Sequence, residues 1–279
     1  MLITPRPGVG LDDLIQTLDS TRNEAFNLWS GGGPGPAHQR LLKYLEWAGR
    51  AARMLGGRIS QADLAALVLN RRYEVLLGSF GTMADTETAV QRVVNDLVSL
   101  ELAERVKDFD AAIATLKAYK ERWSNVGDLL VLDTNFYVEH PDEVQDADLA
   151  RVTAARTPSW AIHVLVPLLV VDELDRLKRD NRVRSRARTA LRTLNTVFAR
   201  VSEDQPMGRL RADAPNMGPV TMELLFDPPE HERLPDPDAE IVDRALAVQI
   251  LSGHDVTMVT YDTSLAFRAR QSGLKDLLL

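Results

Sequence analysis

The feature that most constrains the fold is a change of sequence pattern near residue 125. From there on, short apolar runs rich in Val, Ile and Leu alternate with longer stretches of helical periodicity. The expected strands span residues 129–132, 162–166, 220–226 and 256–260. The expected helices span residues 168–179, 182–200, 238–252 and 264–272. Because strands that alternate with helices connect through right-handed crossovers, this pattern predicts an α/β fold with a parallel sheet.

The part before residue 125 has a different pattern and predicts only helices. Apolar residues recur there at intervals of three and four, and Gly and Pro clusters separate the periodic stretches. The expected helices span residues 11–29, 37–55, 60–77, 86–102 and 109–123. We therefore expect two domains, an all-helical domain over residues 1–125 and an α/β domain over residues 126–279.

The composition excludes several kinds of chemistry. The chain has no cysteine, so disulfides, thiolate metal sites and cysteine nucleophiles are absent, and its five histidines are scattered without ligand spacing. The net charge of −7 comes entirely from residues 126–279, which carry 18 Lys and Arg against 25 Asp and Glu. No signal peptide is visible, and the longest strongly apolar run, residues 164–171, is too short to span a membrane. We expect a cytoplasmic protein that does not enter the membrane.

Four acidic residues in the α/β part stand where an acid is costly unless it is paired or binds a cation. They are Asp133, Glu173, Asp238 and Asp262. Asp133 and Asp262 each follow an apolar run, and ligands of parallel sheets bind at the carboxyl ends of the strands. Four carboxylates that converge there would form a site for a hard divalent cation. Each acid taken alone has a simpler interpretation, as a turn residue or a helix cap.

The helical positions separate these acids from their acidic neighbours. On a helical wheel Asp238 is centred on the apolar face, whereas Glu240 and Asp243 are expected to point away. Capping of the helix is the alternative for Asp238, and Asp236 is a candidate for a further ligand. Glu173 lies at the edge of an apolar face, and its neighbours Asp172 and Asp175 are expected to be surface charges.

Three polar residues adjoin the acids that follow the strands. Thr134 and Asn135 come directly after Asp133 and are expected to orient its carboxylate by hydrogen bonds. Thr260, two residues before Asp262, is expected to hydrogen-bond a ligand carboxylate or the attacking water.

In order and spacing, residues 128–279 resemble the PIN-domain nucleases. The matching segments are LVLDTN (130–135), VPLLVVDELDRLK (166–178), DAEIVDRALA (238–247) and VTYD (259–262). The resemblance implies an α/β/α sandwich with a parallel sheet and an endoribonuclease that hydrolyses RNA with Mg²⁺ or Mn²⁺. It implies metal binding and catalysis by the four acids Asp133, Glu173, Asp238 and Asp262, with assistance from Thr134, Asn135, Asp236 and Thr260. The helical part resembles no family that we can identify.

The expected substrate is single-stranded RNA, and one segment is suited to contact its backbone. Residues 176–200 contain nine Lys and Arg residues, among which Arg179, Arg182 and Arg186 are the candidates for phosphate contact. The alternative is that they form only the solvated face of an amphipathic helix. The loops over residues 202–219 and 228–237 are expected to be mobile flaps near the site.

Two other functions remain open from the sequence. The α/β part would also serve as a non-catalytic RNA- or protein-binding module, with the helical domain providing a surface for a protein partner or for a second copy of the chain. A haloacid-dehalogenase-like phosphatase is disfavoured, because its second acid would stand where this chain has Asn135.

Overall fold

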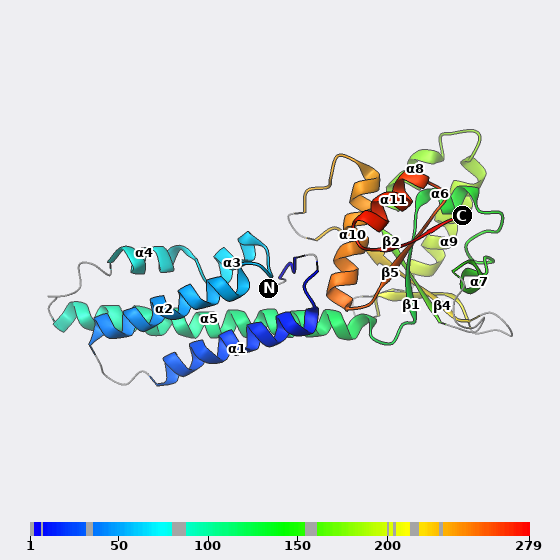
Figure 1. Cartoon of the computed structure of the whole chain (residues 1–279). Coiled ribbons are helices and arrows are strands. Elements are labelled where there is room, and N and C mark those ends of the chain that lie inside the picture. Colours follow the sequence, from blue (N-terminus) through cyan, green and yellow to red (C-terminus); the bar gives the residue numbers. More distant parts are fainter. Residues whose placement is uncertain are drawn as a thin grey trace. The chain divides into compact units, whose positions relative to one another are not determined.

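The computed structural model describes residues 3–6, 8–31, 36–79, 88–153, 161–199, 201–202, 205–212, 218–228 and 231–279. The chain divides into two compact units, Met1–Arg122 and Trp123–Leu279 (Figure 1). The first unit is entirely helical, and the second contains a sheet with helices on both sides, so the predicted fold class is confirmed. Among the described residues, no helix is long and apolar enough to cross a membrane.

In the described part of the helical unit, five helices surround an aromatic and aliphatic core. They are α1 (Leu11–Ser30), α2 (Ala37–Leu55), α3 (Gln61–Leu67), α4 (Arg71–Ser79) and α5 (Thr88–Trp123), whose last residue belongs to the second unit. Trp47 and Phe109 are fully buried, and their rings meet edge to face at 6.3 Å. Such a contact between large buried rings adds to the apolar burial that holds the helices together.

Two expected helix boundaries in this unit were wrong. The stretch 60–77 forms two helices, because the side chain of Asn70 accepts a hydrogen bond from the backbone N–H of Tyr73 and starts a new helix there. Residues 88–102 of the first expected helix and the whole of the second, 109–123, belong to one continuous helix, α5, because residues 103–108 contain no Gly or Pro that would end it. Sequence periodicity marks helical faces better than helix ends.

The sheet of the second unit has six strands in the order β3-β4-β2-β1-β5-β6. The strands are β1 (Asp128–Leu132), β2 (Ile162–Pro167), β3 (Met207–Arg211), β4 (Val220–Leu225), β5 (Val256–Thr260) and β6 (Lys275–Leu278). All neighbouring pairs are parallel except β3 with β4. The central strand β1 pairs with β2 and β5, so the carboxyl ends of these three strands lie side by side.

The described part of the second unit has six helices beside the sheet. They are α6 (Thr134–Glu139), α7 (Leu149–Val152), α8 (Leu168–Leu177), α9 (Arg184–Phe198), α10 (Pro237–Ser252) and α11 (Thr263–Gln271). Helices α6 and α9 lie on one face and α10 and α11 on the other, which gives three layers (Figure 1). This placement follows from right-handed crossovers that run in opposite directions from β1. The expected α/β/α sandwich is therefore present.

Two strands lie where the sequence predicted none. Strand β3 falls within the expected flap 202–219 and pairs antiparallel with β4 at the edge of the sheet. The guanidinium of Arg211 at the end of β3 donates to the carbonyls of Gln145 and Ala147. Strand β6 forms the opposite edge. Edge strands are exposed on one side and carry weak apolar patterns, which explains why the sequence did not reveal them.

The entry into β1 depends on a glycine. Gly127 has a φ of +91°, and a Cβ added there would lie 2.0 Å from the carbonyl oxygen of Ala161. Only glycine tolerates both the backbone conformation and the close approach. Gly127 thereby fixes where β1 begins. It hence also fixes the position of Asp133, which directly follows the last residue of β1.

Candidate active site

Asp133 directly follows β1 and is held from two sides. Its Oδ1 accepts a hydrogen bond from the Phe136 N–H at 2.8 Å, which caps α6, and its Oδ2 accepts one from the Thr260 hydroxyl at 2.6 Å. The residue is only 2% exposed. Burial raises the pKa of Asp133 from 3.8 to about 6, and the negative charges of Asp262 and Asp238 add to this, whereas the two hydrogen bonds oppose it.

Asp262 follows β5 and caps α11. Its Oδ1 accepts hydrogen bonds from the Ser264 and Leu265 N–H groups at 2.6 and 3.2 Å. Its own N–H donates to the Thr260 hydroxyl oxygen at 2.8 Å. Thr260 therefore links the two aspartates of neighbouring strands, and within the described residues the second carboxylate oxygen of Asp262 has no hydrogen-bond partner.

Glu173 reaches the site from α8. Its Oε2 accepts a hydrogen bond from the Thr134 hydroxyl, so Thr134 orients Glu173 and not Asp133, the partner expected from the sequence. Within the described residues the side chain of Asn135 makes no hydrogen bond, although it faces the same cavity. The expected partners of Asp133 were wrong because α6 turns Thr134 away from Asp133 and toward α8.

Asp238 does not cap α10, which was the alternative interpretation of this residue, whereas Asp236 does. The cap of α10 is Asp236, whose Oδ1 accepts from the Asp238 N–H at 3.1 Å and whose other oxygen pairs with Arg268. That ion pair lowers the pKa of Asp236. Asp238 is free of capping, and burial, followed by the charges of Asp262 and Asp236, raises its pKa. Asp238 therefore lies near other acids, and among the described residues no Lys or Arg forms an ion pair with it.

The acids meet at one cavity of about 330 Å³. It is lined by Asp133, Thr134, Asn135, Glu173, Arg176, Leu177, Asp238, Ile241 and Leu265. Asp262 does not line it but lies near enough to raise the pKa values of both Asp133 and Asp238. Three acids from three different elements therefore share one cavity, at the carboxyl edge of the parallel sheet.

The donor set suits a hydrated divalent cation. The four side chains offer hard oxygen ligands, and a cation between them would relieve the repulsion that contributes to the raised pKa values. No three of the four bring oxygen atoms within 4.8 Å of one another, although all four are among the described residues. This spacing fits Mg²⁺ or Mn²⁺ held by one or two carboxylates with water completing the shell, and it does not fit a closed cage.

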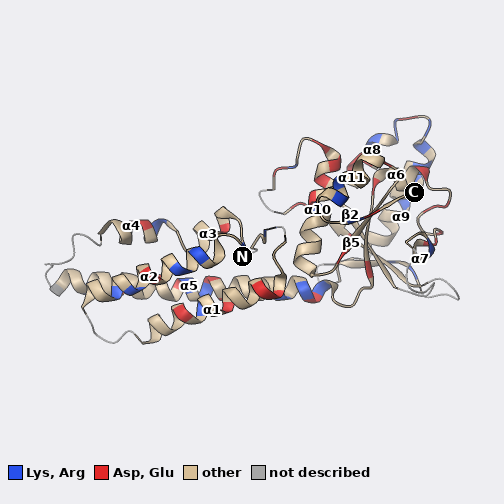
Figure 2. Cartoon of the chain, viewed as in Figure 1, with Lys and Arg blue, Asp and Glu red and all other residues tan. Residues whose placement is uncertain are grey.

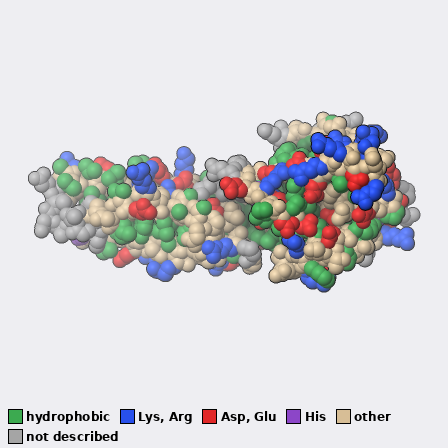
Figure 3. All heavy atoms as spheres, turned by 90° about the horizontal axis from the view of Figure 1, so that it is seen from above, with side chains coloured by type: hydrophobic (Ala, Val, Ile, Leu, Met, Phe, Trp, Pro, Cys, Tyr) green, Lys and Arg blue, Asp and Glu red, His purple; other side chains and the backbone are tan. Residues whose placement is uncertain are grey.

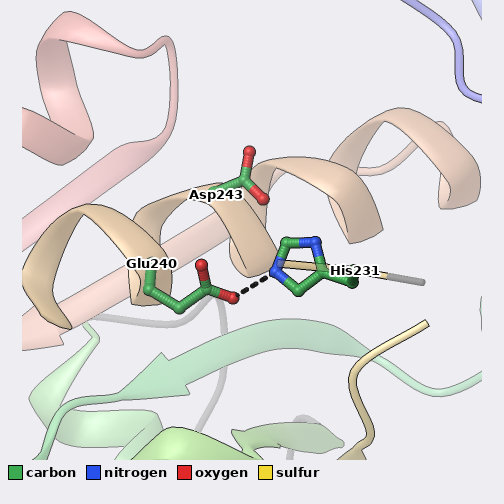
Figure 4. A group of neighbouring side chains, drawn as sticks. All are labelled: His231, Glu240 and Asp243. Carbon is green, nitrogen blue, oxygen red and sulfur yellow. Dashed lines mark hydrogen bonds and ion pairs between the residues drawn. The ribbon is translucent and has the colours of Figure 1, made fainter. Parts of the chain in front are cut away.

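A second group of potential ligands lies on α10 and in the loop before it. His231, Glu240 and Asp243 each offer one ligand atom, and these atoms lie within 4.8 Å of one another (Figure 4). Glu240 is 1% exposed and accepts from His231 Nε2 at 2.7 Å and from the Leu234 N–H at 2.9 Å. Arg244 pairs with both Glu240 and Asp243 and supplies a cation there. We interpret this group as an anchor for the loop that leads into α10.

This group corrects one expectation. Glu240 was expected to point away from the buried face, but the loop 231–236 folds back over its side of the helix and buries it. This folding also brings His231 next to two acids nine and twelve positions later in the sequence. A helical wheel shows one helix alone and cannot include a neighbouring loop.

The loop that was expected to be a flap is also fixed at Arg233. Its guanidinium donates to Asp227 after β4 and to Asp172 on α8, each at 2.7 Å. Asp172, expected to be a surface charge, is therefore an ion-pair partner next to Glu173. Residues 228 and 231–237 of the expected flap are described, and among them Arg233 is tied to α8 and His231 to α10.

The basic residues expected to contact RNA differ in their surroundings. Lys and Arg gather where α8 ends and α9 begins (Figure 2). Arg179 is exposed, Arg182 pairs with Asp180, and Arg186 donates to the carbonyls of His140 and Pro141. Arg186 therefore has a structural contact, which leaves Arg179 and Arg182 better placed for a ligand. Arg176, which lines the cavity itself, was not singled out by the sequence pattern.

Comparison with known protein families matches residues 130–276 to the PIN domain. The match covers more than half of the chain, so the protein belongs to the PIN domain family. Members of this family are generally nucleases that depend on divalent metal ions, and some are not catalytic. The helical unit matches no family, and comparison with curated proteins gives no match.

The raised pKa of Asp133 predicts how pH acts on the metal-free protein. A carboxyl whose folded-state pKa, about 6, exceeds its usual 3.8 stabilises the fold fully below pH 3.8, and that contribution is lost as the pH rises through 6. The difference corresponds to at most about 3 kcal/mol. Divalent ions compete with these protons, so we expect the rise in melting temperature caused by saturating Mn²⁺ to be larger at pH 7.5 than at pH 5.

Thermal unfolding with and without Mn²⁺ at the two pH values measures this difference. The Asp133→Asn variant is the control, because it removes the titrating group and keeps an oxygen to cap α6. An equal Mn²⁺ effect at both pH values in the unaltered protein would contradict the assignment of Asp133 as a ligand.

Proposed function

We propose that the second unit is a divalent-metal-dependent endoribonuclease that uses Mg²⁺ or Mn²⁺. The observation that carries the proposal is the convergence of Asp133, Glu173 and Asp238 on one cavity, with Asp262 beside it. Membership of a family that generally consists of metal-dependent nucleases supports it. We also propose residues 1–125 and 126–279 as the two domains, and the division of the chain at Arg122 and Trp123 agrees with this. A cytoplasmic location stays a prediction.

In this proposal the protein contributes position and charge rather than a nucleophile. A bound divalent cation would supply Lewis-acid stabilisation of the phosphate and an acidified water molecule. Asp133, Glu173, Asp238 and Asp262 would hold the cation and the water molecules that complete its shell. The hydroxyl of Thr260 and the N–H of Phe136 fix both oxygens of Asp133, and Thr134 fixes Glu173. Water is the nucleophile in this proposal, because a water molecule acidified by a divalent cation makes a protein nucleophile unnecessary, which fits the absence of cysteine.

Single-stranded RNA is the substrate that we propose. The cavity of about 330 Å³ is at the lower end of the sizes typical of ligand sites, which supports a substrate that enters it one nucleotide at a time. On the face of the second unit seen in Figure 3, Lys and Arg side chains surround a group of Asp and Glu side chains. Such a surface would attract a phosphate backbone toward a cation held by the acids.

Arg176 is the residue that we expect to contact the phosphate next to the scissile bond. It lines the cavity on the same helix as Glu173, one turn further along. Arg176→Ala should raise KM for single-stranded RNA about tenfold, because one phosphate contact is lost. The slope of the logarithm of the binding constant against the logarithm of the salt concentration should become smaller by about one. Arg188→Ala on α9, which removes an exposed arginine that does not line the cavity, is the matched control. A KM unchanged in Arg176→Ala would exclude this contact.

The proposal is tested by incubating the full-length protein with end-labelled single-stranded RNA and a hairpin of the same composition. Each reaction contains Mg²⁺, Mn²⁺ or a chelator. We expect internal cleavage of the single strand with either ion and none with the chelator, and Asp133→Asn prepared in parallel controls for contaminating nucleases. Binding without cleavage under all conditions would instead support a non-catalytic RNA-binding module.

A further inference from the structure

The group of His231, Glu240 and Asp243 combines one nitrogen ligand with two oxygen ligands from two separate segments. Glu240 and Asp243 are three residues apart on α10 and therefore lie on the same side of the helix. The loop before α10 turns the imidazole of His231 toward them, with Nε2 at 2.7 Å from Glu240 Oε1 (Figure 4). None of the three residues lines the cavity of the acids, so the mechanism proposed for that cavity does not use them.

We propose that this group is a binding site for Zn²⁺, separate from the site for Mg²⁺ or Mn²⁺. Zinc is bound by imidazole nitrogen and carboxylate oxygen, and three protein ligands with a water molecule complete its tetrahedral shell. Imidazole favours zinc, whereas sites made only of carboxylates and water favour Mg²⁺ and Mn²⁺. The acids of the cavity offer oxygen alone, and this group adds the nitrogen of His231. The two sites therefore differ in the ion that they prefer.

The distances within the group suit one small ion. Ligand atoms about 2.0 to 2.2 Å from a tetrahedral zinc ion stand roughly 3.4 Å from one another. The three ligand atoms here lie within 4.8 Å of one another, and the ion takes the place of the proton that His231 and Glu240 share. The side chain of Asp243 is 44% exposed, so it is free to rotate toward the ion and close the remaining distance.

A path for the ion lies beside the group. A cavity of about 280 Å³ is lined by Asp243 of the group and by Leu234 of the loop. It leads to Asp243 from the side of α10 that faces α11, because Arg268 and Gln271 of α11 also line it. An entry path and room for water are what a metal site needs beyond its protein ligands.

Arg244 orients the two carboxylates without using all of their lone pairs. It forms ion pairs with Glu240 and with Asp243, and the Leu234 N–H fixes the other oxygen of Glu240 at 2.9 Å. A carboxylate offers about four lone-pair positions, so each acid pairs with Arg244 and still binds a cation. Within the described residues no other Lys or Arg pairs with either acid, so one of the two negative charges remains for the ion. Such outer partners are usual around metal-binding carboxylates.

Zinc bound here would tighten the attachment of the loop 231–236 to α10. A bond from the metal to His231 is added to the hydrogen bond that the Leu234 N–H donates to Glu240. The loop ends at Asp236, which caps the helix that carries Asp238. Zinc at this group would thus stiffen the segment that positions one acid of the cavity, and we expect amide hydrogen exchange of residues 231–240 to become slower.

Calorimetric titration of the full-length protein with Zn²⁺ in excess Mg²⁺ tests the proposal. Magnesium occupies sites made of oxygen and leaves imidazole sites to zinc. We expect one zinc ion per chain, bound with a dissociation constant in the micromolar range or below. Asp133→Asn, which alters the cavity and not this group, should bind zinc in the same way. Loss of zinc binding in Asp133→Asn would place the ion in the cavity and overturn the proposal.

Two substitutions remove one ligand each. His231→Ala and Asp243→Asn should each weaken zinc binding about a hundredfold or more, because even the loss of an outer partner of a metal ligand costs about 10- to 100-fold. Asp243→Asn is a change of nearly the same shape at a half-exposed position, so it keeps the fold if His231→Ala does not. His254→Ala is the matched control, since His254 is exposed, lies next to Asp255 and is outside the group.

Hydrogen exchange shows where the zinc is bound. In the unaltered protein and in His254→Ala, saturating zinc should slow exchange in residues 231–240, and in Asp243→Asn it should not. An unaltered protein that binds no zinc in excess Mg²⁺ would overturn the proposal. Equally tight binding by His231→Ala and Asp243→Asn, or zinc binding that leaves exchange in residues 231–240 unchanged, would overturn it as well.

Discussion

Asp133→Asn is expected to lower kcat/KM for metal-dependent RNA cleavage by about 10³-fold or more, which is roughly 4 kcal/mol of transition-state stabilisation. Asparagine has nearly the shape of aspartate and keeps the oxygen that accepts from the Phe136 N–H, so the turn into α6 should persist. The substitution removes the negative charge at the position where three strands end side by side. A neutral amide holds Mg²⁺ or Mn²⁺ poorly, and the other acids cannot replace a ligand at the end of β1.

The matched control for this variant is Asp128→Asn. Asp128 is the first residue of the same strand, is exposed, and lies at the end of β1 opposite to the cavity. The Asp128→Asn variant should cleave RNA like the unaltered protein. Asp133→Asn should also be more stable than the unaltered protein at pH 8 without metal, because it has no buried carboxylate to ionise, and the difference should vanish near pH 4. Full activity in purified, folded Asp133→Asn would remove Asp133 from the mechanism.

Glu240→Ala is expected to lower the free energy of unfolding of the second unit by about 3 kcal/mol, the scale for breaking a buried ion-pair network by removing one partner. Glu240 accepts hydrogen bonds from His231 and from the Leu234 N–H and forms an ion pair with Arg244. Its loss leaves a largely buried guanidinium with Asp243 as its remaining counter-charge. The loop 231–236 loses its attachment to α10. Because Asp236 of that loop caps the helix that carries Asp238, we also expect kcat/KM to fall about tenfold, corresponding to about 1.4 kcal/mol.

Urea unfolding measures the first effect, and hydrogen exchange in residues 231–252 locates it. Glu232→Ala is the matched control, since Glu232 lies in the same loop, is exposed, and should leave both measurements unchanged. Equal stability of Glu240→Ala and Glu232→Ala would show that the network does not hold the loop. Increased exchange confined to regions far from the loop would contradict the same interpretation.

The elements that the sequence predicted well are those whose burial alone decides their structure. The runs that became β1, β2, β4 and β5 are largely buried in the interior of the sheet, so most of their residues are apolar, and their predicted bounds agree with the structure to within one residue. Strand β3 is half exposed at an edge and carries two arginines, so its pattern resembles that of a loop. The break between α3 and α4 depends on one side chain, Asn70, that accepts a backbone hydrogen bond.

The partners of the polar side chains could not be predicted in the same way. The sequence placed Asp238 on an apolar face but could not show that Asp236 caps the helix and leaves Asp238 free. It placed Thr134 next to Asp133, whereas the turn of α6 directs its hydroxyl to Glu173. It also placed Glu240 in solvent, where His231 and Arg244 in fact surround it. Each of these outcomes depends on a group that is distant in sequence or on the direction in which a helix points a side chain.

By itself the sequence determined a parallel sheet, an all-helical unit before it, and the positions of acids at the ends of β1 and β5. It did so because apolar periodicity records which side of each element is removed from water, and strand–helix alternation permits few connections. Only the tertiary structure decided which acids share the cavity, that Arg176 joins them, and which acids are neutralised by Arg233, Arg244 and Arg268. Hydrogen bonds and ion pairs form between atoms a few ångströms apart, and periodicity in one dimension carries no information about those distances.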